Sequence, residues 1–256
     1  MYKRQFILLR TRIGKIGIAL LAVPALQLIF ASFLPANATE SNLSAADNTL
    51  ILTSSALVLL MTPGLAFFYG GFTQAKNVLN TMAMSFVMMG IATLVWSTIG
   101  FSLAFSDGGA SNAFIGNPST YAFLENLPSN WEGLQIPGLS FALFQGMFAI
   151  ITPALISGAL VERISFRFWC FFTPIWILLV YAPLAHMVWG GGLLGKDLDF
   201  AGGTVVHISS GVSALVLAGL IGSRSNWPKG IKPPHDLSLI HISEPTRLRR
   251  ISYDGV

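Results

Sequence analysis

Long hydrophobic runs alternate with short polar segments along most of this chain. Five of the runs contain no Asp, Glu, Lys or Arg, and each exceeds the roughly 20 residues that a helix needs to cross a bilayer. They predict membrane-spanning helices over residues 49–74, 78–105, 138–161, 168–194 and 200–222. Several runs contain proline, which membrane helices tolerate as a kink. The pattern therefore predicts an all-α membrane protein with five spans.

The amino-terminal segment has a different pattern. Residues 1–38 carry five lysines and arginines and no acid, and an apolar stretch over residues 16–33 is followed by Ala36-Asn37-Ala38. Basic, then apolar, then small residues is the order of a secretory signal peptide, so we expect residues 1–38 to be cleaved after Ala38. The alternative is an uncleaved first transmembrane helix, since about 18 apolar residues can just span a bilayer. In both cases the next residues begin outside the cytoplasm.

Composition supports a membrane protein and excludes several other classes. Hydrophobic residues make up 53% of the 256 residues and charged residues 10%, with a mean hydropathy of +0.66. The net charge of +4 belongs to the two ends, because residues 39–236 carry seven basic residues and nine acids. No nucleic-acid partner is therefore indicated. The single cysteine, Cys170, lies in an apolar run and excludes a disulfide framework.

The distribution of Lys and Arg among the connecting segments predicts the orientation of the spans. The first and third connections and the segment after the fifth span carry six of them, whereas the second and fourth connections carry only Lys196. Because basic residues favour the cytoplasmic side, the first set is predicted to face the cytoplasm. This agrees with an external start and five crossings. We expect a multi-pass protein of the inner (plasma) membrane.

Two ionisable residues flank the start of the fifth predicted span. Asp199 and His207 are eight positions apart, and no other charged residue follows until Arg224. An ionisable group inside hydrocarbon is costly and usually functional, so His207 is a candidate pore-lining group with a neutral imidazole. The alternative is an interhelical hydrogen bond. Asp199 fits a helix cap, and its carboxylate could also stabilise an arriving cation.

Aromatic residues gather near the predicted outer ends of the third and fourth spans. They are Phe141, Phe144, Phe148, Tyr181 and Trp189. An interface belt explains Trp and Tyr at such depths, and a ring face can also bind a cation. His186 lies one helical turn before Trp189, where it fits a hydrogen bond near the interface. The sequence has no metal-ligand cluster, phosphate loop or GxSxG turn, so it indicates no catalytic residue, no metal and no cofactor.

Short motifs in the central part of the chain resemble one known family. In order they are AFFYGG (66–71), KNVLN (76–80), FQGMF (144–148), GALVERI (158–164), AHMVWGGGLL (185–194) and DFAGGTVVH (199–207). Their order and spacing resemble the Amt/MEP/Rh ammonium transporters, most closely the bacterial Amt branch. The resemblance implies a homotrimer with one hydrophobic pore per subunit. Its substrate would be ammonium or ammonia, with methylammonium as an analogue.

The resemblance also implies roles for individual residues. Trp189 corresponds to the external vestibule ring that meets ammonium by cation–π attraction, and Phe148 to an aromatic gate below it. Asp199 corresponds to a buried acid needed for recruitment and helix integrity, and His207 to the first of two pore histidines. Ammonium is expected to lose its proton and to cross the apolar lumen as ammonia. The remaining positions implied in this way are Ala201 in the vestibule and Phe144 and Val188 in the pore.

The chain departs from the family pattern at both ends. The family has eleven spans, of which the first five are related to the next five as an inverted repeat, and this chain has five. We therefore expect residues 39–236 to be the N-terminal half of the transporter domain, and the chain alone to be inactive. Residues 1–5 and 237–256 resemble translated sequencing adapter and are expected not to be native; a basic cytoplasmic tail is the alternative for the latter. The PII-type regulator that is common in the family would bind outside these spans.

Two other functions fit parts of the pattern. An ammonium sensor would use an Amt-like input domain, and a kinase or cyclase module after the last span would distinguish it. An intramembrane hydrolase would pair His207 with a serine, but Ser209 and Ser210 are too close to it in sequence to indicate a nucleophile. Ammonium transport within a lipid bilayer is therefore the predicted function.

Overall fold

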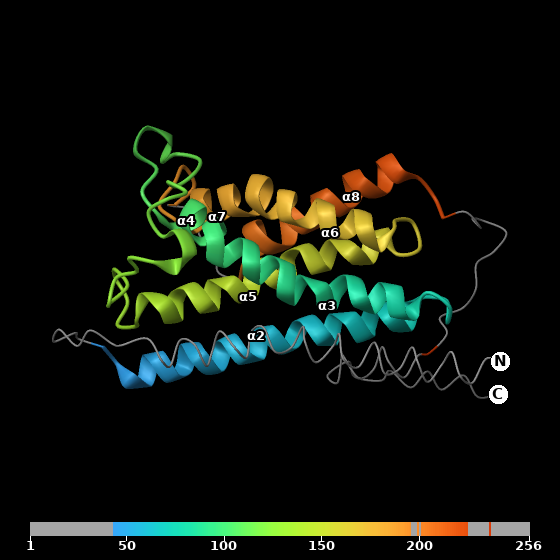
Figure 1. Ribbon diagram of the computed structural model, residues 1–256, viewed down its shortest axis with the longest axis horizontal. Coiled ribbons are helices and arrows are strands. Elements are labelled where there is room, and N and C mark those ends of the chain that lie inside the picture. Colours follow the sequence, from blue (N-terminus) through green and yellow to red (C-terminus); the bar gives the residue numbers. More distant parts are fainter. Residues whose placement is uncertain (1–42, 196–198, 200, 225–235, 237–256) are drawn as a thin grey trace, which may run out of the picture.

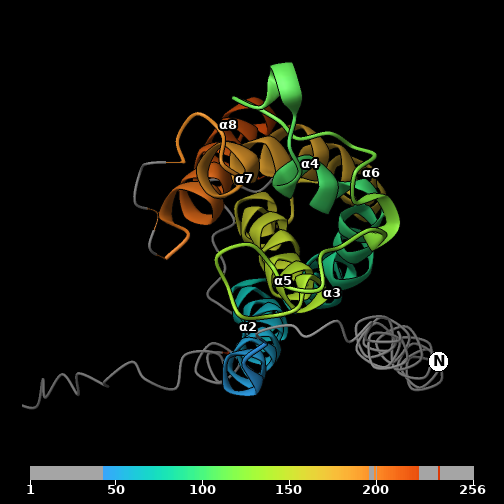
Figure 2. The ribbon, with the colours of Figure 1, turned by 90° about the vertical axis from the view of Figure 1, so that its left-hand side faces the viewer.

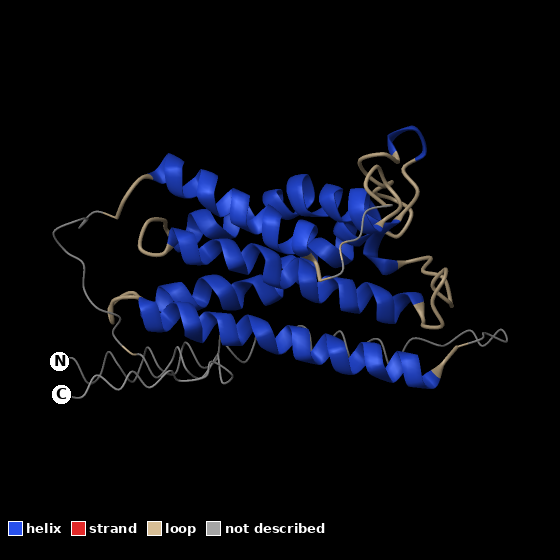
Figure 3. Cartoon of the chain, turned by 180° about the vertical axis from the view of Figure 1, so that it is seen from behind, coloured by secondary structure: helices blue, strands red, loops and turns tan. Residues whose placement is uncertain are grey.

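The computed structural model describes residues 43–195, 199, 201–224 and 236, and the regular secondary structure of these residues is helical, with no β-strand among them (Figure 1 and Figure 3). Five helical stretches in the described part are long and apolar enough to cross a membrane, which confirms the predicted fold class. They are α2 (Ala45–Phe72); α3, η1 and α4 (Val78–Val95, Trp96–Gly100, Phe101–Phe105); α5 and η4 (Gly138–Ser157, Gly158–Leu160); α6, η5 and α7 (Phe166–Trp176, Ile177–Tyr181, Ala182–Trp189); and η6 and α8 (Gly203–Ile208, Ser209–Ile221). The long connection between α4 and α5 contains two short turns, η2 (Gly109–Ser111) and η3 (Ala122–Leu124). The predicted signal peptide and the segment 237–256 lie outside the described residues.

Serine caps extend two helices beyond the predicted runs. α2 begins at Ala45 because the Ser44 side chain accepts a hydrogen bond from the Asp47 amide (3.1 Å). α6 begins at Phe166 because the Ser165 side chain likewise accepts a hydrogen bond from a backbone amide in the first turn of the helix. The uncharged runs alone place the start of both spans later in the sequence, because each helix has a charged residue in its first turn.

Two glycines shorten the predicted outer ends of the fourth and fifth spans. The fourth span ends at Trp189 instead of residue 194, and Gly191 beyond it has a φ of +85°. Gly202, with a φ of +69°, directly precedes η6, so the fifth span begins at Gly203. Glycine adopts this left-handed backbone without a steric penalty. Both turns bring the chain back over the same end of the bundle.

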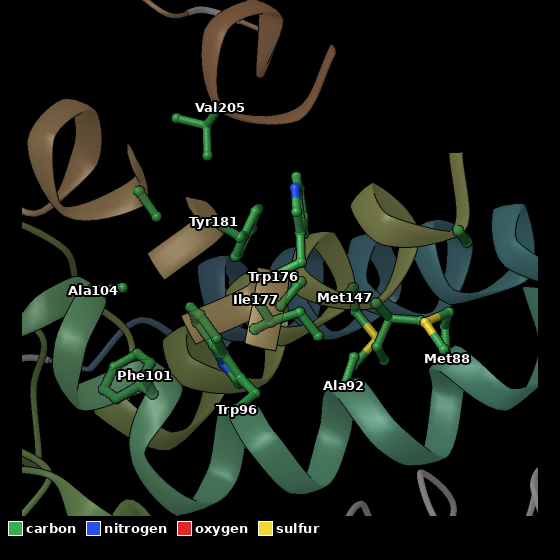
Figure 4. Close-up of a cluster of buried hydrophobic side chains, with 14 of the residues drawn as sticks. Met88, Ala92, Trp96, Phe101, Ala104, Met147, Trp176, Ile177, Tyr181 and Val205 are labelled. Atoms are coloured by element: carbon green, nitrogen blue, oxygen red, sulfur yellow. The ribbon is translucent and has the colours of Figure 1, made fainter. Parts of the chain in front are cut away.

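α5 lies at the centre of the bundle. It packs against α2, α3 and α8, and Figure 2 shows α5 with α2 and α3 on one side and α8 on the other. Its buried positions include Ala142, Gly146, Ala149 and Ala154. Small residues allow close helix packing, which matters where lipid is as apolar as the side chains. Larger buried side chains fill the remaining space around α5, and Figure 4 shows Met88, Trp96, Met147, Trp176, Ile177, Tyr181 and Val205 among them.

Three wide helical turns of the π type, η1, η5 and η6, interrupt the spans. η5 closely precedes Pro183, whose ring nitrogen has no hydrogen to bond with the carbonyl one turn earlier. η1 begins with Trp96, whose indole N–H donates to the Ala142 carbonyl oxygen of α5 (3.0 Å). π-turns occur frequently at functional positions, and η6 contains His207.

α2 approaches the end of the third span most tightly at Gly158. A Cβ atom on Gly158 would lie 2.4 Å from Cζ of Tyr69. The Tyr69 hydroxyl donates a hydrogen bond to the Leu155 carbonyl oxygen (3.0 Å), which holds the ring in this place. Only a residue without a side chain fits at position 158.

Glu162 joins several helix ends at the predicted cytoplasmic end of the bundle. Its Oε1 accepts hydrogen bonds from the Gln74 amide (3.1 Å) and from Asn77 Nδ2 (2.9 Å), both between α2 and α3. Its Oε2 lies 3.7 Å from Nη1 of Arg224, which follows α8. The Glu162 side chain is 8% exposed. A single carboxylate therefore connects the first, second and fifth spans.

Arg163, the next residue, caps α8. Its Nη1 donates to the Gly222 carbonyl oxygen (3.0 Å) at the end of α8. A cation at a helix C-terminus satisfies free carbonyls and complements the helix dipole. We call the pair the Glu162–Arg163 staple.

The partners of Glu162 set its protonation. Burial is the largest single influence and acts to raise the pKa of Glu162. The hydrogen bonds from Asn77 and Gln74 lower the pKa, and the positive charges of Arg224 and Lys76 lower it further. The pKa of Glu162 consequently lies below its ordinary value of 4.5.

We expect Gly158→Ala to destabilise the protein by about 1–3 kcal/mol, the usual effect of overpacking, because its Cβ would collide with the Tyr69 ring. Thermal unfolding in detergent measures this. Gly219→Ala is the matched control, since a Cβ there meets nothing within 4 Å. Equal melting temperatures for the two variants would contradict the close approach.

We expect Glu162→Gln to lower the melting temperature at neutral pH and to remove part of its dependence on acid. The folded pKa of Glu162 is depressed, so its contribution is present above pH 4.5 and is lost as the pH falls through the folded pKa. Melting curves between pH 7 and acid test this. Exposed Glu132→Gln should keep the wild-type profile; the same acid dependence in Glu162→Gln and wild type would disprove the assignment.

Candidate functional site

Three aromatic side chains form a contiguous cluster between the third and fourth spans. Phe144 and Phe148 lie one turn apart on α5, with ring centroids 5.1 Å apart and nearly perpendicular. Trp189, the last residue of α7, meets Phe148 edge to face at 6.2 Å. All three rings are partly exposed in this chain. We call Phe144, Phe148 and Trp189 the aromatic cluster.

The left-handed glycine before η6 brings a carboxylate to this end of the bundle. A Cβ on Gly202 would lie 3.8 Å from Cζ2 of Trp189, so the chain passes close to the indole. Asp199 accepts hydrogen bonds from the Thr204 amide (3.0 Å) and the Val205 amide (3.3 Å). Its two oxygens thus satisfy the first free amides of η6, which is the capping geometry considered from the sequence.

His207 occupies a different position from the aromatic cluster. Its amide donates to the Gly202 carbonyl oxygen (3.1 Å) in the wide turn of η6. The side chain is exposed, while its neighbours Val205 and Val206 are buried. In the described part of the chain, no hydrogen bond or ring contact involves the His207 imidazole. The imidazole therefore points away from the core formed by these five spans.

The other predicted pore and vestibule positions differ in burial. Val188 on α7 is buried with 6% exposure, so within this chain it contributes to packing. Ala201, beside the turn at Gly202, is exposed. The structure thus brings Phe144, Phe148 and Trp189 together and leaves Ala201 and His207 on open surface.

The serines next to His207 are engaged with the helix backbone. Ser209 donates to the Val205 carbonyl oxygen, and Ser210 donates to that of Val206 (2.6 Å). Both hydroxyls are buried. These contacts give a serine nucleophile no support, and no group of three or more metal-ligating side chains occurs among the described residues.

His186 is the residue whose setting the sequence did not reveal. It forms hydrogen bonds, as the sequence predicts, and in addition it is fully buried. Its Nδ1 lies 3.1 Å from the Ala104 carbonyl oxygen and its Nε2 lies 2.8 Å from that of Asn112. These partners are backbone atoms far away in the chain, so residue types alone carried no signal for them.

Comparison with known proteins identifies relatives of the chain. Residues 49–242 match the family model described as Ammonium Transporter Family. The chain is 44% identical over 223 residues to an ammonium transporter of Mycobacterium tuberculosis, covering 77% of this chain and 46% of the relative. It is 46% identical over 201 residues to an ammonium transporter of Aquifex aeolicus, covering 77% and 47%. The chain therefore spans about half the length of the curated relatives it matches.

Solved structures share the fold. The crystal structure of Saccharomyces cerevisiae Mep2 matches with a TM-score of 0.72 and 32% identity, covering 82% of this chain and 48% of that one. A protein named Sensor Amt Protein matches with a TM-score of 0.68 and 26% identity, covering 77% and 50%.

We expect Asp199→Ala to destabilise the protein by about 0.5–2 kcal/mol, as for other lost helix caps, because two amides of η6 lose their acceptor. Asp199→Asn keeps one side-chain oxygen and should lie between Ala and wild type. Thermal unfolding in detergent gives the order. Exposed Glu125→Ala controls for the loss of one acid, and a melting temperature of Asp199→Ala equal to that of this control would rule out a capping role.

Proposed function

This chain belongs to the ammonium transporter family, and we propose that its five spans form the N-terminal half of a pore that moves ammonium or ammonia across a membrane. It is a multi-pass membrane protein, and its family consists of transporters and not of enzymes. The observation that carries the proposal is the contact of Trp189 with Phe148 beside the capped start of η6. This arrangement offers ring faces and a carboxylate at one end of the bundle.

Recruitment would begin at the aromatic cluster. A bare cation over the face of Trp or Phe gains roughly 0.5–2 kcal/mol, depending on how far water is excluded. Trp189 is only partly buried by this chain, so part of its indole remains available to a ligand. The negative charge of Asp199 lies close by and favours a cation over a neutral molecule. We assign the vestibule to Trp189, Phe148, Asp199 and Ala201.

Passage would follow as neutral ammonia. An apolar lumen disfavours ammonium, so the cation gives up its proton to water at the open end of the path, before the hydrophobic part. Phe144 continues the aromatic cluster one turn along α5, and Val188 adds apolar packing on α7. The exposed imidazole of His207, on η6, can hydrogen-bond to ammonia during passage. We assign Phe144, Val188 and His207 to the pore.

The surface of the fifth span supports a pore that is completed by further protein. Leu215 and Leu220 on α8 are 74% and 79% exposed, and His207 is exposed on the same span. Lipid can cover the leucines, but an imidazole in contact with hydrocarbon is unfavourable. We propose that a second half, related to this one as an inverted repeat, faces His207 and closes the pore. The complete protein would assemble as a homotrimer.

The proposed setting is the inner membrane, with the residues before α2 outside after removal of the signal peptide. Arg163 and Arg167 in the third connection, with Arg224 after α8, would then face the cytoplasm. A PII-type regulator would act from that side, through sequence outside the five spans.

An ammonium sensor is the second candidate. The similarity to the protein named Sensor Amt Protein favours it, since that protein shares the fold at a TM-score of 0.68. The two candidates differ beyond the transporter domain, where a sensor carries a signalling module such as a kinase or cyclase. The reading frame downstream of Asp236 distinguishes them.

We expect cells that lack their own ammonium transporters and make only this 256-residue chain to show no uptake of labelled methylammonium. The reason is that His207 is exposed in this chain, and in this proposal the pore wall opposite it belongs to the second half. Residues 1–236 joined to the remaining half of the Aquifex aeolicus relative should restore uptake, and Trp189→Ala in the joined protein should reduce it.

The remaining half of the relative, made alone, controls for background uptake. Uptake by the 256-residue chain alone would overturn the half-pore proposal. A joined protein that reaches the membrane but takes up no methylammonium would count against transport and in favour of the sensor.

A further inference from the structure

His186 occupies the contact between α4 and the C-terminal end of α7, which lie side by side (Figure 1 and Figure 2). Its side chain is fully buried, although the residue lies only three positions before the partly exposed Trp189. The ring reaches the end of α4 through the Ala104 carbonyl oxygen. It reaches the following external segment through the Asn112 carbonyl oxygen. One imidazole thus connects three backbone segments.

The chemistry of these contacts is unusual for a packed histidine. A carbonyl oxygen only accepts hydrogen bonds, so a neutral ring can donate to one of the two oxygens and an imidazolium to both. The two segments that meet here contain almost no other ionisable group. In residues 101–113 and 182–195, the only other ionisable residue is Asp107, which is exposed and accepts a hydrogen bond from the Gly109 amide. The ring is therefore held by backbone and not by a charged partner.

Further contacts extend this junction past Trp189. A Cβ on Gly190 would lie 2.1 Å from the Ala104 carbonyl oxygen, so α4 and the end of α7 touch backbone to backbone. The Leu193 amide donates to the Ala113 carbonyl oxygen (2.9 Å). Trp189 thus sits between two anchoring points, His186 before it and the turn at Gly190–Leu193 after it.

We propose that His186 is a positioning residue for Trp189: by binding the backbone of α4 and of the segment 106–113, it sets the height and direction of the indole over Phe148. This rests on the proposed function, in which the Trp189 ring meets ammonium. Without the imidazole, the end of α7 loses one of its two anchors on α4 and the segment 106–113. Trp189 then keeps only the anchor at Gly190–Leu193, the edge contact with Phe148 and the close approach of Gly202.

The position of the indole can be measured without any transport. The 256-residue chain, labelled with 5-fluorotryptophan and placed in lipid nanodiscs, gives ¹⁹F signals that single Trp→Phe variants assign. We expect His186→Ala to shift or split the Trp189 signal. The Trp169 signal should stay in place, because its indole donates to the Met84 carbonyl oxygen elsewhere in the bundle (2.8 Å).

Two further variants and one control sharpen this measurement. Gly190→Ala forces α4 and α7 apart and should change the Trp189 signal in the same way, even if His186→Ala does not accumulate. His186→Gln supplies an amide with two N–H groups and should restore most of the wild-type signal. Thr173→Val removes a buried hydrogen bond in the same span, to the Trp169 carbonyl oxygen (3.0 Å), and should leave Trp189 unchanged.

The joined protein described above then tests the consequence for recruitment. We expect His186→Ala and Gly190→Ala to raise KM for methylammonium about three- to tenfold, the range of one weakened cation–π contact, with little change in maximal uptake per folded protein. A merely structural role would lower maximal uptake and leave KM unchanged. An unchanged Trp189 signal in folded His186→Ala, or in Gly190→Ala where His186→Ala does not accumulate, would overturn the positioning role. A shifted signal in a joined protein without transport would leave the positioning role standing and remove only the proposed function.

Discussion

A bilayer has no water to satisfy the peptide groups of a helix, and this constraint governs where polar side chains occur in the bundle. Asp199 takes up two free amides at the start of η6, Ser44 takes up one at the start of α2, and Arg163 satisfies a carbonyl at the end of α8. Wide π-turns keep the remaining groups bonded where Pro183 or a left-handed glycine disturbs the regular pattern. Asp199, which corresponds to a functional residue of the family, thus also completes a helix.

The number and type of spans could be predicted because each depends only on an uncharged run of sufficient length. The ends of the helices could not be predicted in this way, because each end depends on a single capping or turn residue. Ser165 caps α6 although Arg167 follows within its first turn, and Gly191 ends the fourth span inside an apolar run. Hydropathy does not distinguish a glycine in a helix from a glycine in a left-handed turn, since only the backbone around it decides.

Part of the candidate site was also predictable. The spacing of Phe144 and Phe148 places both on one face of α5, and the family motifs indicated Trp189 as their neighbour. The partners of His186 and Glu162 were not predictable. His186 binds backbone carbonyls, which every residue has, and Glu162 appeared in a basic connection as one more loop charge. Its burial depends on contacts with three separate spans.

The Glu162–Arg163 staple has a consequence for the order of events during synthesis. Gln74 and Asn77 have already been synthesised when Glu162 emerges from the ribosome. Arg224 and the Gly222 carbonyl emerge about 60 residues later. The contact between Arg163 and the end of α8 can therefore form only after the fifth span has been synthesised. Adjacent residues of opposite charge in this way join the first and second spans to the fifth, so these contacts are complete only when the fifth span is in place.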